Sequence, residues 1–262
     1  MTRLVTTAAA LALVAWLGGC AADQLLSAGG ASVEMATTAS SASAYAGAKP
    51  TDASEPPAGP REVIATPTVA DIMQTGSLPE MAWGKADAPV VVVKYMSLTC
   101  PYCKKFHIEV FPDLKKRYVD TGKVRFILRE FPIGKTSGNA TIALRCAKPE
   151  KYLDLYGRFL AQQATWVSQE VRPDAIFAVA SQVGMKRDEF DGCLKNQAMI
   201  DGLKWVKDRG RTLGIIGTPN FFVDGKLVKR VLTLADISAM IDAALTGKGG
   251  ATSAAERTAP TR

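Results

Sequence analysis

In the centre of the chain, an apolar run interrupted by a single lysine is followed by apolar residues at helical spacing. Residues 90–96 are β-branched or aromatic apart from Lys94 and Met96, which predicts a central strand buried on both faces. Pro101 then occupies the first helical position that proline favours, and apolar residues recur at helical spacing until Gly122. Residues 124–131 predict a second strand. Strand, helix and strand in this order predict a right-handed βαβ unit with parallel strands.

After the second strand, only helical patterns occur as far as residue 215. They predict several helices that form one inserted subdomain at about residues 135–215. Strand patterns return at residues 220–223 and 227–231, on either side of Asp224-Gly225, a dipeptide typical of hairpin turns. A final helix is predicted for residues 234–245. The pattern is that of an α/β domain with a helical insertion, within residues 61–245.

The first twenty residues have the organisation of a secretory signal peptide. Arg3 precedes an apolar stretch of residues 4–17, and small residues lead to Cys20. The stretch is too short for a transmembrane helix, which needs about 20 residues. Residues 17–20, Leu-Gly-Gly-Cys, resemble the lipobox of bacterial lipoproteins, which implies cleavage before Cys20 and a lipid on its sulfur. An ordinary signal peptide is the alternative. Either reading places the mature protein outside the cytoplasm, in a compartment where disulfides persist.

Two segments lack apolar periodicity. In residues 21–60, 29 of 40 residues are Ala, Ser, Thr, Gly or Pro, the composition of a flexible linker. Residues 246–262 have a similar character and predict a disordered tail. If Cys20 carries a lipid, the linker becomes a tether between the membrane and the domain.

Composition and charge narrow the function classes. A hydrophobic content of 47% excludes disorder throughout. The formal net charge is +7, but Lys and Arg are not clustered and do not alternate with aromatic residues. A mildly basic, solvated surface is therefore favoured, and no nucleic-acid partner is expected.

The sequence Cys100-Pro101-Tyr102-Cys103 lies where the central strand meets a helix N-terminus. Cys100 is then the expected N-cap, where unpaired N–H groups and the helix dipole favour a thiolate. A stabilised thiolate is a good leaving group, so its disulfide is an oxidant. Cys103, one turn further into the helix, is placed to be the resolving thiol.

Three other roles for these cysteines are less favoured. A zinc site needs four ligands, and Cys100, Cys103 and His107, the only histidine, give three. A structural disulfide across a two-residue loop constrains the unfolded chain very little. A Cys–His hydrolase pair would need the histidine beside Cys100, whereas His107 lies one turn beyond Cys103. We expect neither a metal nor a cofactor.

A second signal is Gly217-Thr218-Pro219, immediately before the strand at residues 220–223. Proline is tolerated at the start of a strand because it has no N–H to donate, so Pro219 alone does not indicate a functional site. Combined with the strand, Cys-X-X-Cys and helix order, however, it looks like the cis-proline loop that faces the active site in thioredoxin-like proteins. The backbone of Thr218 would then pair with an extended client peptide.

The chain resembles the DsbA family of periplasmic thiol:disulfide oxidoreductases over roughly residues 70–245. Residues 88–107, the helical insertion and residues 217–223 carry the resemblance. It implies a thioredoxin-like fold with an inserted helical subdomain and a disulfide donor to secreted proteins. It also implies reoxidation by a membrane partner of the DsbB type.

Two residues depart from the family pattern. Tyr102 stands where the best-studied oxidases have histidine, which predicts a less stabilised thiolate and a less oxidising disulfide. Lys94 stands where the family usually has an acidic residue. An ammonium near Cys100 would favour the thiolate and so make the disulfide more oxidising. Alternatively, Lys94 extends into solvent as an ordinary strand-end residue.

Cys146 and Cys193 both lie on predicted helices of the insertion, 47 positions apart. In an oxidising compartment a structural disulfide is the natural pairing. Two unpaired buried thiols, or a second redox pair, are the alternatives.

The sequence therefore predicts a monomeric, lipid-anchored thiol:disulfide oxidoreductase of the periplasm or cell envelope. Its partners would be secreted proteins with free thiols or disulfides. A reductase or isomerase of the same fold is one alternative, and a non-catalytic holdase or envelope interaction module is another.

Overall fold

The computed structural model describes residues 62–257. The predicted signal peptide at 1–20, including Cys20, and the predicted linker at 21–60 lie outside the described residues.

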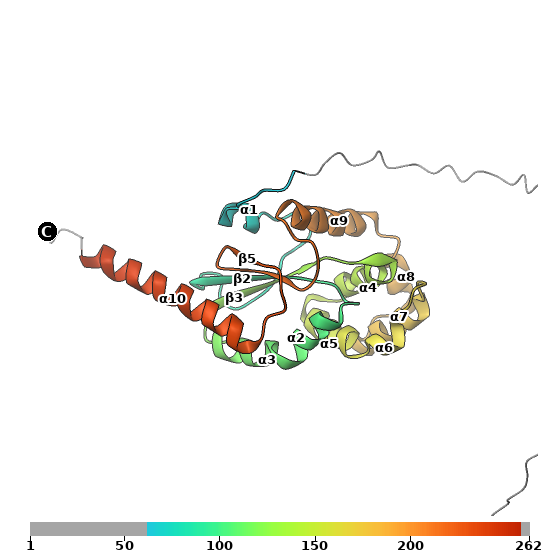
Figure 1. Ribbon diagram of the computed structural model, residues 1–262. Helices are drawn as coiled ribbons and strands as arrows, with labels where there is room; N and C mark the ends of the chain where they lie inside the picture. The colour runs from blue at the N-terminus through green and yellow to red at the C-terminus, as the bar shows by residue number, and fades with distance from the viewer. Residues whose placement is uncertain (1–61, 258–262) are drawn as a thin grey trace, which may run out of the picture. The chain divides into compact units, whose positions relative to one another are not determined.

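A five-stranded mixed sheet forms the centre of the domain (Figure 1). Its strands are β1 (Met81–Trp83), β2 (Val90–Met96), β3 (Val124–Glu130), β4 (Asn220–Val223) and β5 (Lys226–Val228). They lie in the order β1-β3-β2-β4-β5, and only β2 and β3 are parallel. The central position of β2 explains its largely apolar sequence, because side chains on both faces of a covered strand are buried.

Helices cover both faces of the sheet. In Figure 1, α1 (Val69–Met73) and α9 (Gln197–Thr212) lie on one face, with α2 (Pro101–Glu109), α3 (Phe111–Leu114) and α10 (Leu234–Arg257) on the other. Between β3 and α9 the chain forms an insertion made of α4 (Gly134–Cys146), α5 (Tyr152–Ala161), α6 (Gln163–Trp166), α7 (Pro173–Ala180) and α8 (Arg187–Cys193). Short 3₁₀ turns lie at Pro149–Lys151 and Ser181–Val183, and a π-helical turn at Lys115–Val119 follows α3.

The sheet separates two apolar cores. Alternate residues of β2 point to opposite faces, so Val92 and Met96 join the core beneath α2 and the insertion. Val93 and Tyr95 join the core beneath α1 and α9. Lys94 is in phase with Val92 and Met96, and it therefore lies on the face that α2 covers. This phase places an amine inside the larger core.

This architecture confirms the predicted thioredoxin-like α/β fold with a helical insertion. The hairpin between β4 and β5 turns at Asp224 and Gly225, whose φ angles of 47° and 81° are those of a type I′ turn. β5 ends at Val228 rather than at the predicted residue 231. The helix predicted from residue 101 to Gly122 is divided, because α2 ends at Glu109 and α3 begins a new helix with Pro112 in its first turn.

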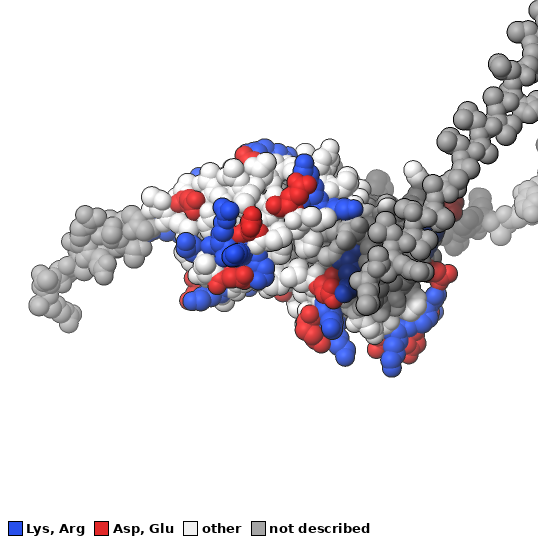
Figure 2. All heavy atoms as spheres, turned by 90° about the horizontal axis from the view of Figure 1, so that it is seen from below, with Lys and Arg blue, Asp and Glu red and all other residues white. Residues whose placement is uncertain are grey.

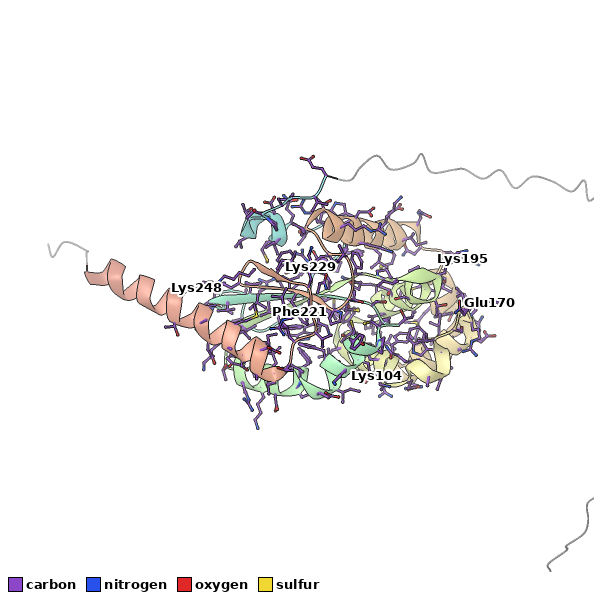
Figure 3. The ribbon with its side chains drawn as sticks, in the orientation of Figure 1. Lys104, Glu170, Lys195, Phe221, Lys229 and Lys248 are labelled. Carbon is purple, nitrogen blue, oxygen red and sulfur yellow. A yellow bond between two sulfur atoms is a disulfide. The ribbon has the colours of Figure 1, made fainter. Side chains whose placement is uncertain are left out.

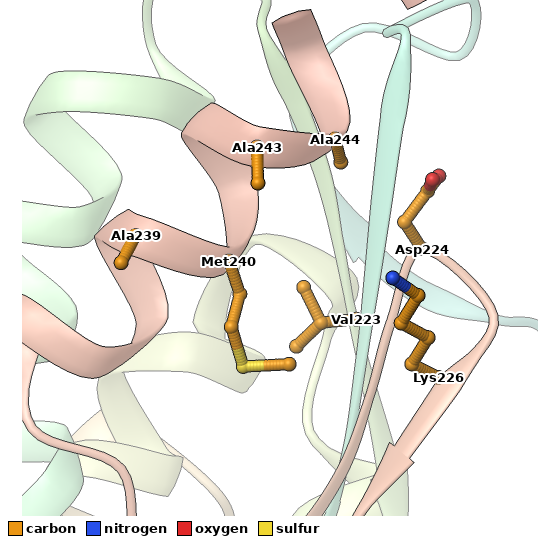
Figure 4. Close-up of a pocket in the computed structure, with 7 residues that line it drawn as sticks. All are labelled: Val223, Asp224, Lys226, Ala239, Met240, Ala243 and Ala244. Atoms are coloured by element: carbon orange, nitrogen blue, oxygen red, sulfur yellow. The ribbon is translucent and has the colours of Figure 1, made fainter. Parts of the chain in front are cut away.

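The final helix extends beyond its predicted end at residue 245. α10 continues to Arg257, so the prediction of a disordered tail from residue 246 is wrong for its described part. Thr246 donates a hydrogen bond to the carbonyl of Asp242, and Lys248 contacts the Asp224 carboxylate at 2.6 Å. Nearer its start, Met240 of α10 reaches toward Val223 across a pocket beside the β4–β5 hairpin (Figure 4). The Thr246 bond lies within the helix, whereas the contacts of Lys248 and Met240 hold the helix against the β4–β5 hairpin.

Charged side chains of both signs lie side by side on one face of the domain (Figure 2). The face shown in Figure 2 carries Lys and Arg next to Asp and Glu rather than a field of one sign. Pairs such as Lys115–Asp120 and Arg158–Asp154 are exposed, and pairs of this kind contribute at most about 1 kcal/mol each. On this face the basic side chains are therefore not gathered into one patch (Figure 2). Across residues 62–257, no helix combines the length and apolar character needed to span a bilayer.

Candidate active site

Cys100 is the N-cap residue of α2. Its φ of −79° and ψ of 119° are extended, and its sulfur accepts a hydrogen bond from the backbone N–H of Cys103 at 3.4 Å. Pro101 begins the helix and has no N–H of its own to leave unpaired. Tyr102 is 57% exposed and points away from the core. The sequence of the strand–helix junction therefore places one half-buried sulfur at the positive end of a helix.

The surroundings of Cys100 favour its thiolate. A hydrogen bond from the Cys103 thiol is the largest influence, and the side chain of Thr218 and the backbone N–H groups of Tyr102 and Cys103 add to it. Together they outweigh the opposing effect of burial and lower the pKa of Cys100 from 9.0 to about 5. At neutral pH the reduced protein therefore carries a thiolate at this position.

Cys103 has the opposite character. Its side chain is fully buried, and burial raises its pKa well above the ordinary value of 9.0. The ammonium of Lys94 partly opposes this effect. Cys100 is thus an acidic thiol that is partly accessible, whereas Cys103 is buried and stays protonated.

The peptide bond between Thr218 and Pro219 is cis. β4 begins at Asn220, which pairs with Tyr95 of β2, so the loop before β4 lies beside the end of β2 that leads to Cys100. The Cys100 thiol donates a hydrogen bond to the Thr218 carbonyl at 3.1 Å. The Thr218 hydroxyl is buried without a hydrogen-bond partner among the described residues. When Cys100 loses its proton, this hydroxyl can donate to the thiolate.

Lys94 lies in the core and does not extend into solvent, so the solvated alternative is wrong. Its side chain is 1% exposed, with Nζ 4.3 Å from the centre of the Phe106 ring. Nζ donates a hydrogen bond to the Tyr156 hydroxyl at 3.2 Å. Burial lowers the pKa of Lys94 from 10.5 to about 8, while the negative charges of Cys103 and Cys100 act to raise it. The amine is therefore coupled electrostatically to both cysteines.

Several residues of the insertion reach this site, and the sequence analysis missed them. Tyr156 of α5 bonds Lys94, Ser137 of α4 bonds Ser97, and Gln163 of α6 bonds the segment before Cys100. His107, which we considered as a zinc ligand, packs between the rings of Phe111 and Tyr156. Burial lowers its pKa to about 4, so it is neutral at physiological pH. Within residues 62–257, no group of three potential metal ligands converges.

Cys146 and Cys193 are joined by a disulfide with a Cα–Cα distance of 6.2 Å. Cys146 ends α4 and Cys193 ends α8, so the bond ties two helices of the insertion together. Cys100 and Cys103 are both free thiols and take no part in this bond.

The strand–helix junction with its cysteine pair, and the cis-proline loop facing it, define a thioredoxin-like protein with a redox-type cysteine motif. Comparison with known proteins agrees. The family model described as Thioredoxin matches residues 77–243, and the chain belongs to this family.

Relatives within the family are named for disulfide chemistry. A putative protein-disulfide oxidoreductase of Rickettsia bellii is 30% identical over 196 residues, which cover 72% of this chain and 74% of the relative. The corresponding protein of Rickettsia conorii is 32% identical, and the match spans 56% of this chain but only 53% of that relative. Among solved structures, Wolbachia pipientis alpha-DsbA1 superimposes with a TM-score of 0.60 at 25% identity, covering 68% of this chain and 98% of that one. The resemblance to DsbA proteins is thereby confirmed.

Proposed function

We propose that this protein is an extracytoplasmic thiol:disulfide oxidoreductase that exchanges disulfides with client proteins through Cys100 and Cys103. The observation that carries the proposal is the contrast between the two thiols. The surroundings hold the pKa of Cys100 at about 5, while Cys103 behind it is fully buried and protonated. An accessible thiolate next to a buried resolving thiol is the arrangement that disulfide exchange requires.

The reaction follows from this geometry. In the oxidised protein, a client thiolate attacks Cys100 Sγ, the Cys100–Cys103 bond breaks, and Cys103 leaves as a thiolate that takes up a proton. A second client thiolate then attacks the client sulfur of the mixed disulfide, and Cys100 leaves as a stable thiolate. Two electrons pass from the client to the protein, and the client gains a disulfide. The Thr218 backbone beside Cys100 is placed to pair with the client segment during this exchange.

The acidity of Cys100 favours the oxidising direction. Leaving-group thiols of lower pKa leave faster, and stabilising the reduced form makes the disulfide a stronger oxidant. A pKa of about 5 lies between the values of ~3.5 for strong oxidants and ~7 for thioredoxin. The names of the relatives, which include a disulfide bond formation protein D of Bacillus subtilis, support the same chemistry.

Equilibration with glutathione tests this direction. We expect a Cys100–Cys103 potential between about −120 and −200 mV, because the thiolate is stabilised but less so than in the strongest oxidants. The measurement is the fraction of oxidised protein in defined mixtures of reduced and oxidised glutathione. A potential near about −270 mV would favour the reductase alternative. A protein that oxidises no dithiol peptide and reduces no disulfide would favour the non-catalytic interaction module.

We further propose that the protein is attached to the cell envelope by a lipid on Cys20, acts as a monomer and is reoxidised by a membrane partner of the DsbB type. The lipobox-like residues 17–20 support the anchor. Mass spectrometry of the mature protein is expected to show an N-terminal Cys20 with added diacylglycerol. A mature N-terminus elsewhere, or an unmodified Cys20, would exclude the anchor.

A further inference from the structure

One side chain of the insertion holds two carbonyl groups of the segment that leads to Cys100. Nε2 of Gln163, the first residue of α6, lies 2.7 Å from the carbonyl oxygen of Leu98 and 3.1 Å from that of Cys100. An amide NH₂ group has two hydrogens, so one side chain can donate to both oxygens. The reversed amide would bring Oε1 against two carbonyl oxygens and repel them, which fixes Gln163 as the donor.

These two bonds restrict the backbone at the reactive cysteine. The carbonyl of Cys100 also accepts the N–H of Lys104 at 3.2 Å, so donors hold it from two elements. The direction of this carbonyl is set by the Cys100 ψ angle of 119°. The same angle determines where the first N–H groups of α2 lie relative to the Cys100 sulfur. Fixing the carbonyl therefore also fixes the hydrogen-bond donors that stabilise the thiolate.

Gln163 is itself held by a rigid element. Trp166, one turn later in α6, is fully buried, and its Nε1 donates to the Phe159 carbonyl at 2.8 Å. Its ring packs edge-on against the Phe159 ring at 5.2 Å. A side chain presented from such an anchored turn can hold its partners in place with little loss of conformational entropy.

The insertion contacts the same region at two further points. The Ser137 hydroxyl of α4 lies 2.8 Å from that of Ser97, and Lys104 of α2 donates to the Ala161 carbonyl at 3.2 Å. Lys104 is labelled in Figure 3, on the first turns of α2 close to the insertion. Of these contacts, only the one from Gln163 reaches the backbone of Cys100 itself.

We propose that Gln163 is a positioning residue for disulfide exchange, which sets the acidity and reactivity of Cys100 by fixing the carbonyls of Leu98 and Cys100. This inference rests on the proposed function for its kinetic consequence. Without Gln163, the segment before α2 can rotate, the N–H groups of α2 align less well with the sulfur, and Cys100 becomes a poorer leaving group.

The test compares the substitutions Gln163→Met and Gln162→Met in the full domain. Gln162 is the adjacent glutamine, and it exchanges amide hydrogen bonds with Gln182 instead of contacting the active-site segment. We expect Gln163→Met to slow oxidation of a dithiol peptide about threefold to tenfold, because hydrogen bonds of this kind contribute about 1 kcal/mol. The pKa of Cys100, followed by the ultraviolet absorbance of the thiolate, is expected to rise. Gln162→Met should retain the wild-type rate and pKa.

A second variant, Gln163→Glu, tests the same two hydrogen bonds with a side chain that cannot donate them. An ionised carboxylate cannot donate to the carbonyls and adds a negative charge near the thiolate, so both effects should be larger than for methionine. The inference is overturned if both Gln163 variants keep the wild-type pKa and rate, or if Gln162→Met changes them equally. A fall in melting temperature without a change in pKa would also overturn it. If wild-type protein exchanges no disulfides, the proposed function fails, and the pKa comparison still tests the positioning of Cys100.

Discussion

Replacing Cys100 with serine is expected to reduce disulfide exchange to background, whereas replacing Cys103 with serine is expected to trap the client. Without Cys100 the protein has no accessible thiolate at the helix N-terminus, and serine ionises far too weakly to replace it. In the Cys103→Ser variant, the half-buried Cys100 keeps its position at the N-terminus of α2 and can still attack a client disulfide. The mixed disulfide then persists, because the resolving thiol is absent.

The measurements are a dithiol-peptide oxidation assay for both variants and non-reducing electrophoresis for the trapped complex. A Cys146→Ser/Cys193→Ser double variant is the control, since those two sulfurs are bonded to each other and not to Cys100 or Cys103. Alkylation of reduced Cys100 should reach half its maximal rate near pH 5, because the thiolate is the reactive form. Residual exchange by Cys100→Ser, or a double variant as inactive as Cys100→Ser, would contradict the assignment.

Replacing Lys94 with methionine is expected to stabilise the protein at neutral pH. The pKa of Lys94 falls from 10.5 in the unfolded chain to about 8 in the folded protein, so folding disfavours the ammonium. At 1.36 kcal/mol per pKa unit, this difference costs about 3 kcal/mol at pH 7. Methionine has a similar volume and no charge, but it loses the hydrogen bond to Tyr156, which contributes about 1 kcal/mol. We expect a net gain of about 2 kcal/mol.

The pH dependence of the stability difference between Lys94→Met and wild type shows whether the gain comes from removing the buried ammonium or from better packing. Between pH 8 and 10.5 the unfolded chain binds more protons at Lys94 than the folded protein does, so wild-type stability rises with pH in that window. The advantage of Lys94→Met over wild type should therefore be full below pH 8 and fade toward pH 10.5. Urea unfolding of the reduced proteins at several pH values measures it. Lys105→Met, at a lysine 61% exposed, is the control and should change stability by less than about 0.5 kcal/mol. A Lys94→Met variant that is less stable than wild type at pH 7 would refute the account.

The same variant should lose activity while it gains stability. The Lys94 ammonium lowers the pKa of Cys103, so it stabilises the thiolate that leaves when a client attacks Cys100. Its removal makes Cys103 a poorer leaving group and slows the first step of exchange. A buried charge that destabilises the fold but assists the chemistry is a frequent arrangement in active sites.

The sequence predicted the parts of the site that are encoded locally. The apolar residues of β2, Pro101 at the first helical position and the spacing of the two cysteines all act within one strand–helix junction, so Cys100 could be identified as the N-cap. Pro219 could be placed opposite only because the order of strand, Cys-X-X-Cys and helix resembles that of thioredoxin-like proteins, since proline at a strand start is by itself explained by its missing N–H. The fold class followed from the same alternation of strand and helix periodicities.

The contacts that tune the site could not be predicted, because they join residues distant in sequence. Lys94 was ambiguous in the sequence, and only the Tyr156 and Phe106 side chains show that its amine is buried. Gln163 looks like any polar residue of a surface helix until α6 is placed against the active-site segment. β1 and α1, with three and five residues, are too short for a periodicity to be recognised. The end of α10 was misplaced because its alanine- and glycine-rich sequence resembles a linker, while its contacts with Asp224 come from the fold.

The hydrogen bond between Cys100 and Thr218 spans 118 positions of the chain. During synthesis from the N-terminus, the cysteine pair and its helix are complete long before the loop at residues 217–219 is made. Until β4 pairs with β2, Cys100 lacks the Thr218 side chain that helps to lower its pKa. The full acidity of the thiol is thus reached only by the finished domain, and a partly made chain is a weaker participant in disulfide exchange than the folded protein.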